Sequence, residues 1–236
     1  MALLKIYQDK NGYSYNTDSL LLYGFIYKIL KTCNSPKDLL DVGANTGILG
    51  LLALRDFDIF LESIELEKDA FFLLSQNAKK YPKIKLINAD FLTHKFNKKY
   101  DVIISNPPFY GVNKTPPKSH KMALARSEKY MPIDAFLKRA RDLMYMDSNL
   151  IFCFEGARFD EVKLALKNAG FFIKTLQFVH SKPENMPNLA LIHAVLFQSE
   201  ITLLPPLYVQ NTDGLISKEA KEIYTHCNTY SIKVSL

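Results

Sequence analysis

Short apolar strands alternate with helical segments along most of this chain. Strands are predicted where compact apolar runs lie between turn residues, and helices where apolar residues recur every three or four positions. The predicted strands are 39–42, 60–66, 83–90, 100–105, 149–155, 171–180 and 189–198, and the predicted helices are 16–30, 48–57, 67–81, 132–145 and 159–170. The alternation predicts an α/β fold: a seven-stranded, mostly parallel sheet with helices on both faces and an antiparallel C-terminal strand. Ligands of such sheets bind beyond the carboxyl ends of the strands.

Length and composition indicate one globular domain. The 236 residues, 48% of them apolar, can bury a substantial core. We expect a main domain over 1–200, which includes the N-terminal helix, and a tail over 201–236 that packs on the same domain. Three scattered cysteines without a CxxC pair indicate a reducing cytosol, and the five histidines show no metal-binding spacing. No apolar stretch is long enough to span a membrane, so we expect a cytoplasmic monomer without metal.

A glycine-containing loop follows the first buried strand. Its sequence DVGANTG contains Asp41, Gly43, Asn45 and Gly47. Glycines allow backbone N–H groups to approach a ligand at a helix N-terminus, and asparagine tolerates a left-handed backbone well. A plain structural turn between a strand and a helix also favours Gly and Asn. We take these four residues as candidates for cofactor binding, with the structural turn as the alternative.

Acidic residues follow the second and third strands. Glu65 could accept hydrogen bonds from both hydroxyls of a ribose, or it could complement the dipole of the helix that follows. Asp90 could accept from an adenine amino group while Phe91 covers the ring, or Asp90 could form a turn while Phe91 joins the core. Together with the glycine loop, these residues predict a cofactor site at three successive strand ends.

The fourth strand ends in the corner SNPPFYG, which contains Asn106, Pro107, Pro108 and Phe109. Neither proline carries a backbone N–H, so the strand cannot continue through them. The rigid corner presents one amide and one flat ring beyond the sheet. The alternative is a structural turn with Phe109 buried.

Positive charge is concentrated directly after this corner. The formal charge of the chain is +6, and residues 111–141 contain eight Lys or Arg against two acids, so this window accounts for the whole excess. A local basic segment suits a nucleic-acid backbone, and it is equally compatible with a solvated loop and helix face. The candidate RNA-binding residues in it are Lys114, Lys118, Lys121 and Arg126.

The order of glycine loop, two acids and Asn-Pro-Pro-Phe resembles the class I S-adenosylmethionine-dependent methyltransferases, whose fold is Rossmann-like. The NPPF motif is similar to that of the members that methylate exocyclic or amide nitrogen. A closer resemblance is to the tRNA adenine methyltransferases that act beside the anticodon of a valine tRNA. That resemblance is carried by YNTDSLLL (15–22), ARSE (125–128), MPID (131–134) and the tail segments TDG (212–214) and SKEAKEIYTH (217–226).

The resemblance implies roles for individual residues. S-adenosylmethionine would be the cofactor and tRNA or another structured RNA the partner. Thr17 and Asp18 would reach the methionine end of the cofactor, although a simple helix cap explains them equally well. Asn106 would also touch the cofactor, and its Oδ1 together with the carbonyl of Pro107 would accept the amino hydrogens of the target base. Phe109 would stack on the extruded base.

Two departures from the family pattern stand out. Asn45 replaces the middle glycine of the loop, and the loop SKPENMPNLAL lacks an arginine expected after its proline. The alternative functions are a glutamine methyltransferase acting on a release factor and a non-catalytic RNA-binding protein of the same fold. A glutamine methyltransferase would carry a sizeable helical domain in front, whereas only 40 residues precede Asp41. Ribosomal-RNA guanine and DNA adenine methyltransferases would need additional domains or inserts.

Overall fold

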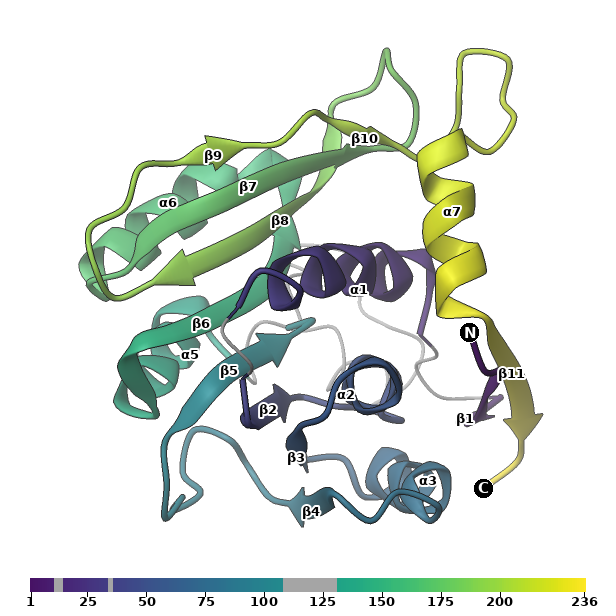
Figure 1. Cartoon of the computed structure of the whole chain (residues 1–236), viewed down its shortest axis with the longest axis vertical. Coiled ribbons are helices and arrows are strands. Elements are labelled where there is room, and N and C mark those ends of the chain that lie inside the picture. Colours follow the sequence, from purple (N-terminus) through teal and green to yellow (C-terminus); the bar gives the residue numbers. More distant parts are fainter. Residues whose placement is uncertain (11–14, 34–35, 108–130) are drawn as a thin grey trace.

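A computed structural model describes residues 1–10, 15–33, 36–107 and 131–236, and its centre is a sheet of nine strands (Figure 1). Seven strands form its body in the order β7-β8-β6-β5-β2-β3-β4. Their bounds are β2 (Asp38–Val42), β3 (Phe60–Glu65), β4 (Ile84–Asn88), β5 (Tyr100–Ser105), β6 (Met144–Glu155), β7 (Phe172–His180) and β8 (Pro187–Val195). Only β8 runs antiparallel to its neighbours among these seven. The predicted fold class is confirmed.

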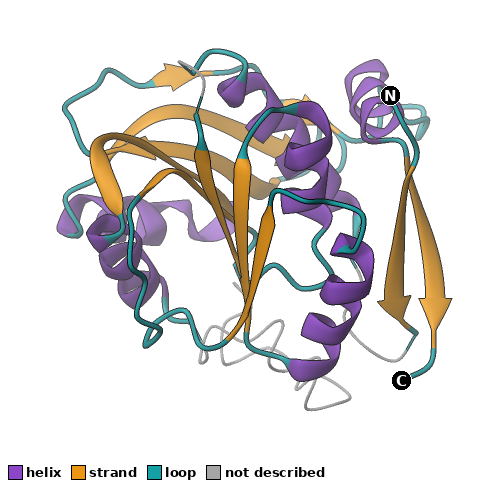
Figure 2. Cartoon of the chain, turned by 60° about the horizontal axis from the view of Figure 1, so that its bottom comes forward, coloured by secondary structure: helices purple, strands orange, loops and turns teal. Residues whose placement is uncertain are grey.

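Helices cover both faces of this sheet (Figure 2). One face carries α1 (Thr17–Leu30), α2 (Ile48–Asp56) and α3 (Lys68–Ala78), and the other carries α5 (Ile133–Asp142) and α6 (Phe159–Asn168). The strands between them are buried on both sides, which explains why they are continuously apolar in the sequence. Asn16 caps α1 by accepting a hydrogen bond from the backbone N–H of Ser19. In the part of the chain that is described, no helix is long and apolar enough to cross a membrane.

The helix predicted over 67–81 ends at Ala78, and the helix predicted over 132–145 is also too long at its C-terminal end. The prediction extends it to residue 145, whereas α5 ends at Asp142 and strand β6 begins at Met144. Met144 pairs with Tyr100 of β5, and the hydroxyl of Ser148 donates to the carbonyl of Tyr100 at 2.7 Å. Pairing with a distant strand therefore decides the state of residues whose local pattern is compatible with a helix.

The first and the last strand of the chain lie side by side, next to the main sheet. Strand β1 (Leu4–Asp9) pairs in parallel with β11 (Thr229–Val234) as a separate sheet next to α3 (Figure 1). The short strands β9 (Thr202–Leu203) and β10 (Leu207–Tyr208) extend the main sheet along β7, and α7 (Lys218–Cys227) packs on α1. A boundary near residue 200 stays a prediction.

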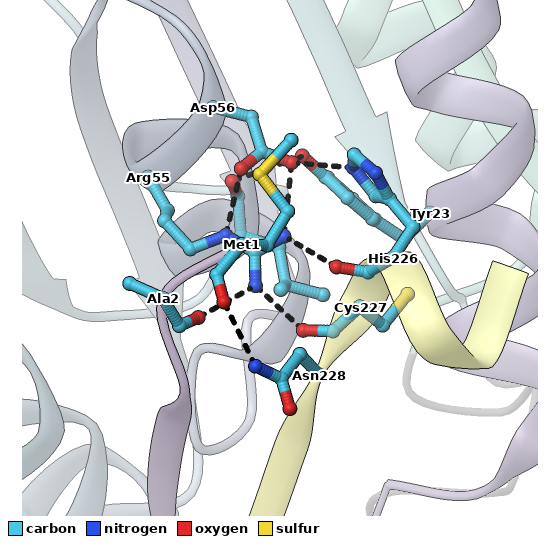
Figure 3. A network of polar contacts seen from close by, with 9 residues as sticks. Met1, Ala2, Tyr23, Arg55, Asp56, His226, Cys227 and Asn228 are labelled. Carbon is cyan, nitrogen blue, oxygen red and sulfur yellow. Dashed lines mark hydrogen bonds and ion pairs between the residues drawn. The ribbon is translucent and has the colours of Figure 1, made fainter.

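A polar network joins the N-terminus and the end of α7 to the end of α2 (Figure 3). The buried carboxylate of Asp56 accepts from Tyr23 at 2.7 Å and from Arg55 at 2.7 and 3.0 Å, and it lies 2.8 Å from His226. Burial alone would raise the pKa of Asp56, but these hydrogen bonds together lower it. Arg55 also donates to the carbonyls of Cys227, His226 and Ala2. The network thus fixes α7 and the N-terminus against α1 and α2.

Candidate active site

The predicted site residues that are described gather at the carboxyl edge of the sheet. Strands β2, β3 and β5 are parallel neighbours, so their ends bring the glycine loop, Glu65 and Asn106 to the same edge, and Asp90 follows the end of β4 next to them. Pro108, Phe109, Lys114, Lys118, Lys121 and Arg126 lie outside the described residues, and their roles stay predictions.

The glycine loop has three residues in the left-handed region. Gly43, Asn45 and Gly47 have φ angles of 65°, 51° and 93°, so Asn45 adopts the conformation expected for it. A Cβ on Gly47 would lie 2.5 Å from Leu74 Cδ1, so a side chain here would displace Leu74 of α3 and would also be strained by the φ of 93°. Among the described residues, a Cβ on Gly43 would meet Met131 Cε alone, at 4.0 Å. The described part of the chain therefore leaves room for a ligand at the exposed backbone of Gly43.

Glu65 is held beneath this loop by two backbone donors. Its Oε2 accepts from the N–H of Asn45 at 2.7 Å, and its Oε1 accepts from the N–H of Glu67 at 2.8 Å. Burial raises the pKa of Glu65, and backbone hydrogen bonds from Glu67, Asn45 and Leu66 partly offset that rise. The side-chain cap of α3 is Glu67, which accepts from Ala70, while Glu65 accepts from the N–H of this N-cap residue. Its position is therefore compatible with a ribose acceptor and with the alternative, an acid that complements the dipole of α3. A carboxylate has about four acceptor sites, so after these described donors Glu65 keeps acceptor capacity for about one ligand hydroxyl.

Asp41 stabilises the junction between the glycine loop and α2. Its side chain is 1% exposed, and its Oδ2 accepts from the N–H of Gly50 at 3.0 Å in the first turn of α2. Gly47, the N-cap of α2, provides no side-chain cap, so Asp41 satisfies one of the free N–H groups of that turn. Burial raises the pKa of Asp41 to about 7, and the charge of Glu65 adds to the rise. Direct contact between Asp41 and a cofactor stays a prediction.

The third strand end combines a turn with core packing. Asp90 Oδ1 accepts from the N–H of Leu92 at 2.9 Å and leaves the half-buried carboxylate with further acceptor capacity. Phe91 is 5% exposed, and its ring packs 6.1 Å from that of Phe96 and 5.8 Å from that of Phe136. Phe91 therefore occupies the core position of the alternative interpretation, and a contact between its ring and a cofactor stays a prediction.

Asn106 is clamped between α1 and β6. Its Nδ2 donates to Ser19 Oγ at 3.1 Å, and its Oδ1 accepts from the thiol of Cys153 at 3.0 Å. Cys153 is 0% exposed, and burial raises its pKa well above the usual range, so the thiol keeps its proton. The corner is also fixed by Ser105, whose hydroxyl donates to the carbonyl of Val42 at 2.9 Å. The amide is therefore oriented before any substrate arrives.

Three residues with a positioning role were not predicted from the sequence. Ser19 and Cys153 hold Asn106, and Asn77 of α3 donates to the carbonyl of Thr46 in the glycine loop at 2.9 Å. Asn77 also exchanges two hydrogen bonds with the backbone of Tyr7 in β1. Only Ser19 carried a signal, because it lies in the segment YNTDSLLL.

Thr17 and Asp18, at the start of α1, line a cavity on the β6 and β7 side of Asn106, where Glu155 at the end of β6 also contributes. Burial raises the pKa of Asp18, and a hydrogen bond from Asn16 partly offsets the rise. Contact of these two residues with the methionine end of a cofactor stays a prediction. Among the described residues, no cluster of His, Cys, Asp or Glu could hold a metal ion.

The chain is similar to known methyltransferases in sequence and in structure. Residues 24–135 match the family model of the methyltransferase small domain. The tRNA1(Val) (adenine(37)-N6)-methyltransferase of Aliivibrio fischeri is 30% identical over 85% of this chain and 82% of the relative, and that of Bacteroides thetaiotaomicron is 25% identical over 92% and 91%. The crystal structure of a predicted O-methyltransferase from Agrobacterium tumefaciens superposes with a TM-score of 0.67 at 14% identity, covering 92% of this chain and 99% of the other. At this low identity, the structural likeness shows that the two chains share a fold.

Proposed function

This chain belongs to the family of the tRNA1(Val) (adenine(37)-N6)-methyltransferases, which are S-adenosylmethionine-dependent, and we propose that it methylates the exocyclic amino group of adenine 37 in tRNA1(Val). The observation that carries the proposal is the pre-oriented amide of Asn106 at the carboxyl end of β5. An amide held in this way suits an acceptor with two N–H groups and a poorly nucleophilic nitrogen.

The described residues fit the cofactor. The space that the described residues leave at Gly43 and the remaining acceptor capacity of Glu65 suit a nucleoside with a ribose, and Asp90 can accept from an adenine amino group. When bound, S-adenosylmethionine supplies an electrophilic methyl group on a sulfonium centre. The protein has to keep that group in line with the acceptor nitrogen, and such positioning supplies a large part of catalysis.

The acceptor nitrogen is activated by hydrogen bonding. The lone pair of an adenine amino group is delocalised into the ring, which makes the nitrogen a poor nucleophile. Asn106 Oδ1 uses one acceptor position for the Cys153 thiol and offers the other to an amino hydrogen, while the Pro107 carbonyl accepts the second. These bonds favour a pyramidal nitrogen whose lone pair points outward. The methylated nitrogen is acidic while cationic, and it loses its proton to Asn106 or water.

Nucleoside mass spectrometry tests this function. Purified protein is incubated with S-adenosylmethionine and bulk tRNA that lacks the modification, and the expected product is N6-methyladenosine at position 37 of tRNA1(Val). Asn106→Ala should abolish the product while the thermal stabilisation by S-adenosylmethionine stays near that of the wild type.

Two results would contradict the proposal. Methylation by the Asn106→Ala variant would show that the amide is not required. Wild-type protein that binds the cofactor and modifies no tRNA nucleoside would favour a protein glutamine as acceptor or a purely binding role. We further propose that the enzyme acts as a cytoplasmic monomer, which sedimentation of the purified chain can check.

A further inference from the structure

A cavity of about 460 Å³ opens at the carboxyl edge of the sheet, beyond β6 and β7. Its polar wall consists of Thr17, Asp18, Glu155, Ser181, Asn188 and Gln210. These residues come from the start of α1, the end of β6, the loop after β7, the start of β8, and the tail after β10. The volume falls within the range of small-molecule pockets and suits one nucleoside.

The cavity lies beside the catalytic amide. Asp18 directly precedes Ser19, which accepts the hydrogen bond from Asn106 Nδ2. Glu155 follows two residues after Cys153, which donates to Asn106 Oδ1, and residues two apart on a strand lie on the same face, about 6–7 Å apart. Each carboxylate of the cavity is thus one or two positions away from a residue that holds Asn106. A ligand in this cavity would be a neighbour of the acceptor base.

The tail completes the cavity through defined backbone bonds. The N–H of Val209 donates to the carbonyl of His180, and that of Gln210 donates to the carbonyl of Ser181, each at 2.9 Å. The N–H of Ser181 in turn donates to Asn188 Oδ1 at 2.8 Å. The wall made by the tail is therefore ordered before any ligand binds.

The composition of the wall selects the kind of ligand. The described residues that line the cavity include two carboxylates and no Lys or Arg, so this wall supplies no cation for a phosphate group and suits a ligand with N–H donors better. Leu21, Val179, Leu189 and Val209 supply apolar surface that suits a flat ring. Carboxylates accept from the amino and imino groups of nucleobases, and the side-chain amides of Asn188 and Gln210 can either donate or accept.

We propose that this cavity binds the nucleobase adjacent to the methylated adenine and selects it by hydrogen bonds to its polar wall, in which the side-chain amides of Asn188 and Gln210 distinguish one base from another. The inference rests on the proposed function. It gives the tail a role in RNA recognition and places Thr17 and Asp18 at a substrate subsite.

The test uses unmodified transcripts of tRNA1(Val) in which positions 36 and 38 carry each of the four bases. Wild-type enzyme should discriminate among bases at one of these positions by at least tenfold in kcat/KM. The double variant Asn188→Ala, Gln210→Ala should reduce that preference to about threefold or less. Val209→Trp, which fills the cavity, should raise KM for the best transcript at least tenfold and leave the Kd for S-adenosylmethionine within twofold of wild type.

Leu203→Trp is the matched control, because Leu203 lies in the same tail, is 64% exposed and does not line the cavity. It should leave KM and base preference unchanged. Two results would contradict this inference and leave the proposed function intact. One is a base preference that survives the double variant, and the other is an unchanged KM for RNA in Val209→Trp. A weakened Kd for S-adenosylmethionine in Val209→Trp would also overturn the inference and assign the cavity to the cofactor. Wild-type enzyme without tRNA turnover would instead overturn the proposed function.

Discussion

The buried thiol of Cys153 decides which way the Asn106 amide faces. The hydroxyl of Ser19 can accept or donate, so it would satisfy either end of the amide. The thiol keeps its proton, and sulfur is a weak acceptor, so Cys153 favours the oxygen of Asn106 over the nitrogen. The orientation matters for chemistry, because only the oxygen can accept an amino hydrogen of the acceptor base.

Replacing Cys153 should therefore change kcat more than binding. Cys153→Ala removes the donor, and we expect kcat to fall about tenfold, the equivalent of one hydrogen bond of about 1.4 kcal/mol. Cys153→Ser keeps a donor and should restore most of the wild-type kcat. The Kd for S-adenosylmethionine should stay within twofold for both variants. Steady-state kinetics with calorimetry of cofactor binding separates these quantities.

Cys227→Ala controls for loss of a buried thiol, since Cys227 is equally buried and bonds only weakly to the carbonyl of Leu20, at 3.8 Å. It should leave kcat unchanged. If Cys153→Ala and Cys227→Ala have the same kcat, or if Cys153→Ser is as slow as Cys153→Ala, the orienting role of Cys153 is wrong.

Asp41 should make stability depend on pH. Its pKa is about 7 in the fold and close to 3.8 when the chain is unfolded. Between these values the unfolded chain has released a proton that the folded chain retains, so the free energy of unfolding falls as pH rises from about 4 to 7. A shift of about three units corresponds to an upper limit on the order of 4 kcal/mol. Asp41→Asn keeps an acceptor for Gly50 and removes this contribution.

Urea denaturation of the cofactor-free protein at pH 4.5, 6 and 7.5 measures the effect. The wild type should lose more stability over this interval than Asp41→Asn does. Glu65, whose pKa is also raised, contributes to the slope that both proteins share. Equal slopes for the two proteins would show that Asp41 ionises normally in the fold.

Sequence reasoning found the residues that lie at strand ends and missed those that hold them. Asn45 and Asn106 stand out because each has a local signature, a left-handed turn or a proline corner. Ser19 and Cys153 are separated from Asn106 by 87 and 47 residues, and their contacts exist only after the chain folds. A serine in a helix and a cysteine in an apolar strand look like ordinary core residues.

At the scale of elements, local patterns predicted which segments form strands, while long-range pairing decided their ends and neighbours. The antiparallel pair β7 and β8 was expected, and it is present. The insertion of β8 between β6 and β7 was not predicted, because the sequence of an apolar strand does not specify which neighbour lies on each side. The predicted C-terminal end of α5 was wrong because pairing of β6 with β5, which local sequence does not specify, decides where the helix stops.

Helix α1 lies between the corner that carries Asn106 and the tail. Its N-terminal end carries Ser19, and its middle packs on α7 so closely that a Cβ on Gly24 would lie 2.9 Å from Ile223 Cγ2. A glycine inside a helix usually costs stability, about 1 kcal/mol relative to alanine. Here the absence of a side chain allows the two helices to meet.

Gly24→Leu should separate α7 from α1. Overpacking of this kind costs about 1–3 kcal/mol, and we expect the free energy of unfolding to fall by that amount, with faster hydrogen exchange in α7. Ile223→Ala makes room, so the double variant Gly24→Leu, Ile223→Ala should be more stable than the sum of the two single effects predicts. Strict additivity in chemical denaturation would show that the two positions do not meet.

At the scale of the whole molecule, two arginines of the basic window 111–141 stabilise the fold. Arg139 donates to the carbonyl of His94 and lies 5.7 Å from the centre of the Phe96 ring, and Arg141 donates to the carbonyl of Ala169 at 2.6 Å. Both arginines therefore secure α5 against its surroundings. Charge counting along the sequence could not separate these two from the lysines that precede them, because it carries no information about backbone acceptors.

The lysines before α5 are the ones expected to neutralise RNA phosphates. Each phosphate contact contributes about −0.7 to −0.9 to the slope of log Kobs against log salt concentration. Replacing Lys114, Lys118 and Lys121 together by alanine should therefore reduce the magnitude of that slope by about 2 and weaken tRNA binding most at low salt. Fluorescence anisotropy with labelled tRNA1(Val) transcript between about 50 and 300 mM salt measures this slope, because affinity that comes from phosphate contacts falls steeply as salt rises through such a range.

The matched control removes three positive charges elsewhere, from the exposed Lys163 and Lys167 of α6 and Lys218 of α7. If net charge alone attracted the RNA, both triple variants would lose the same slope, since each lowers the formal charge from +6 to the same value. If the RNA backbone follows the segment after the corner, only the first variant should lose it, because ion release requires contact with the phosphates rather than attraction from a distance. An equal loss in both would show that Lys114, Lys118 and Lys121 do not form the RNA site, while leaving the methyl-transfer chemistry at Asn106 untouched.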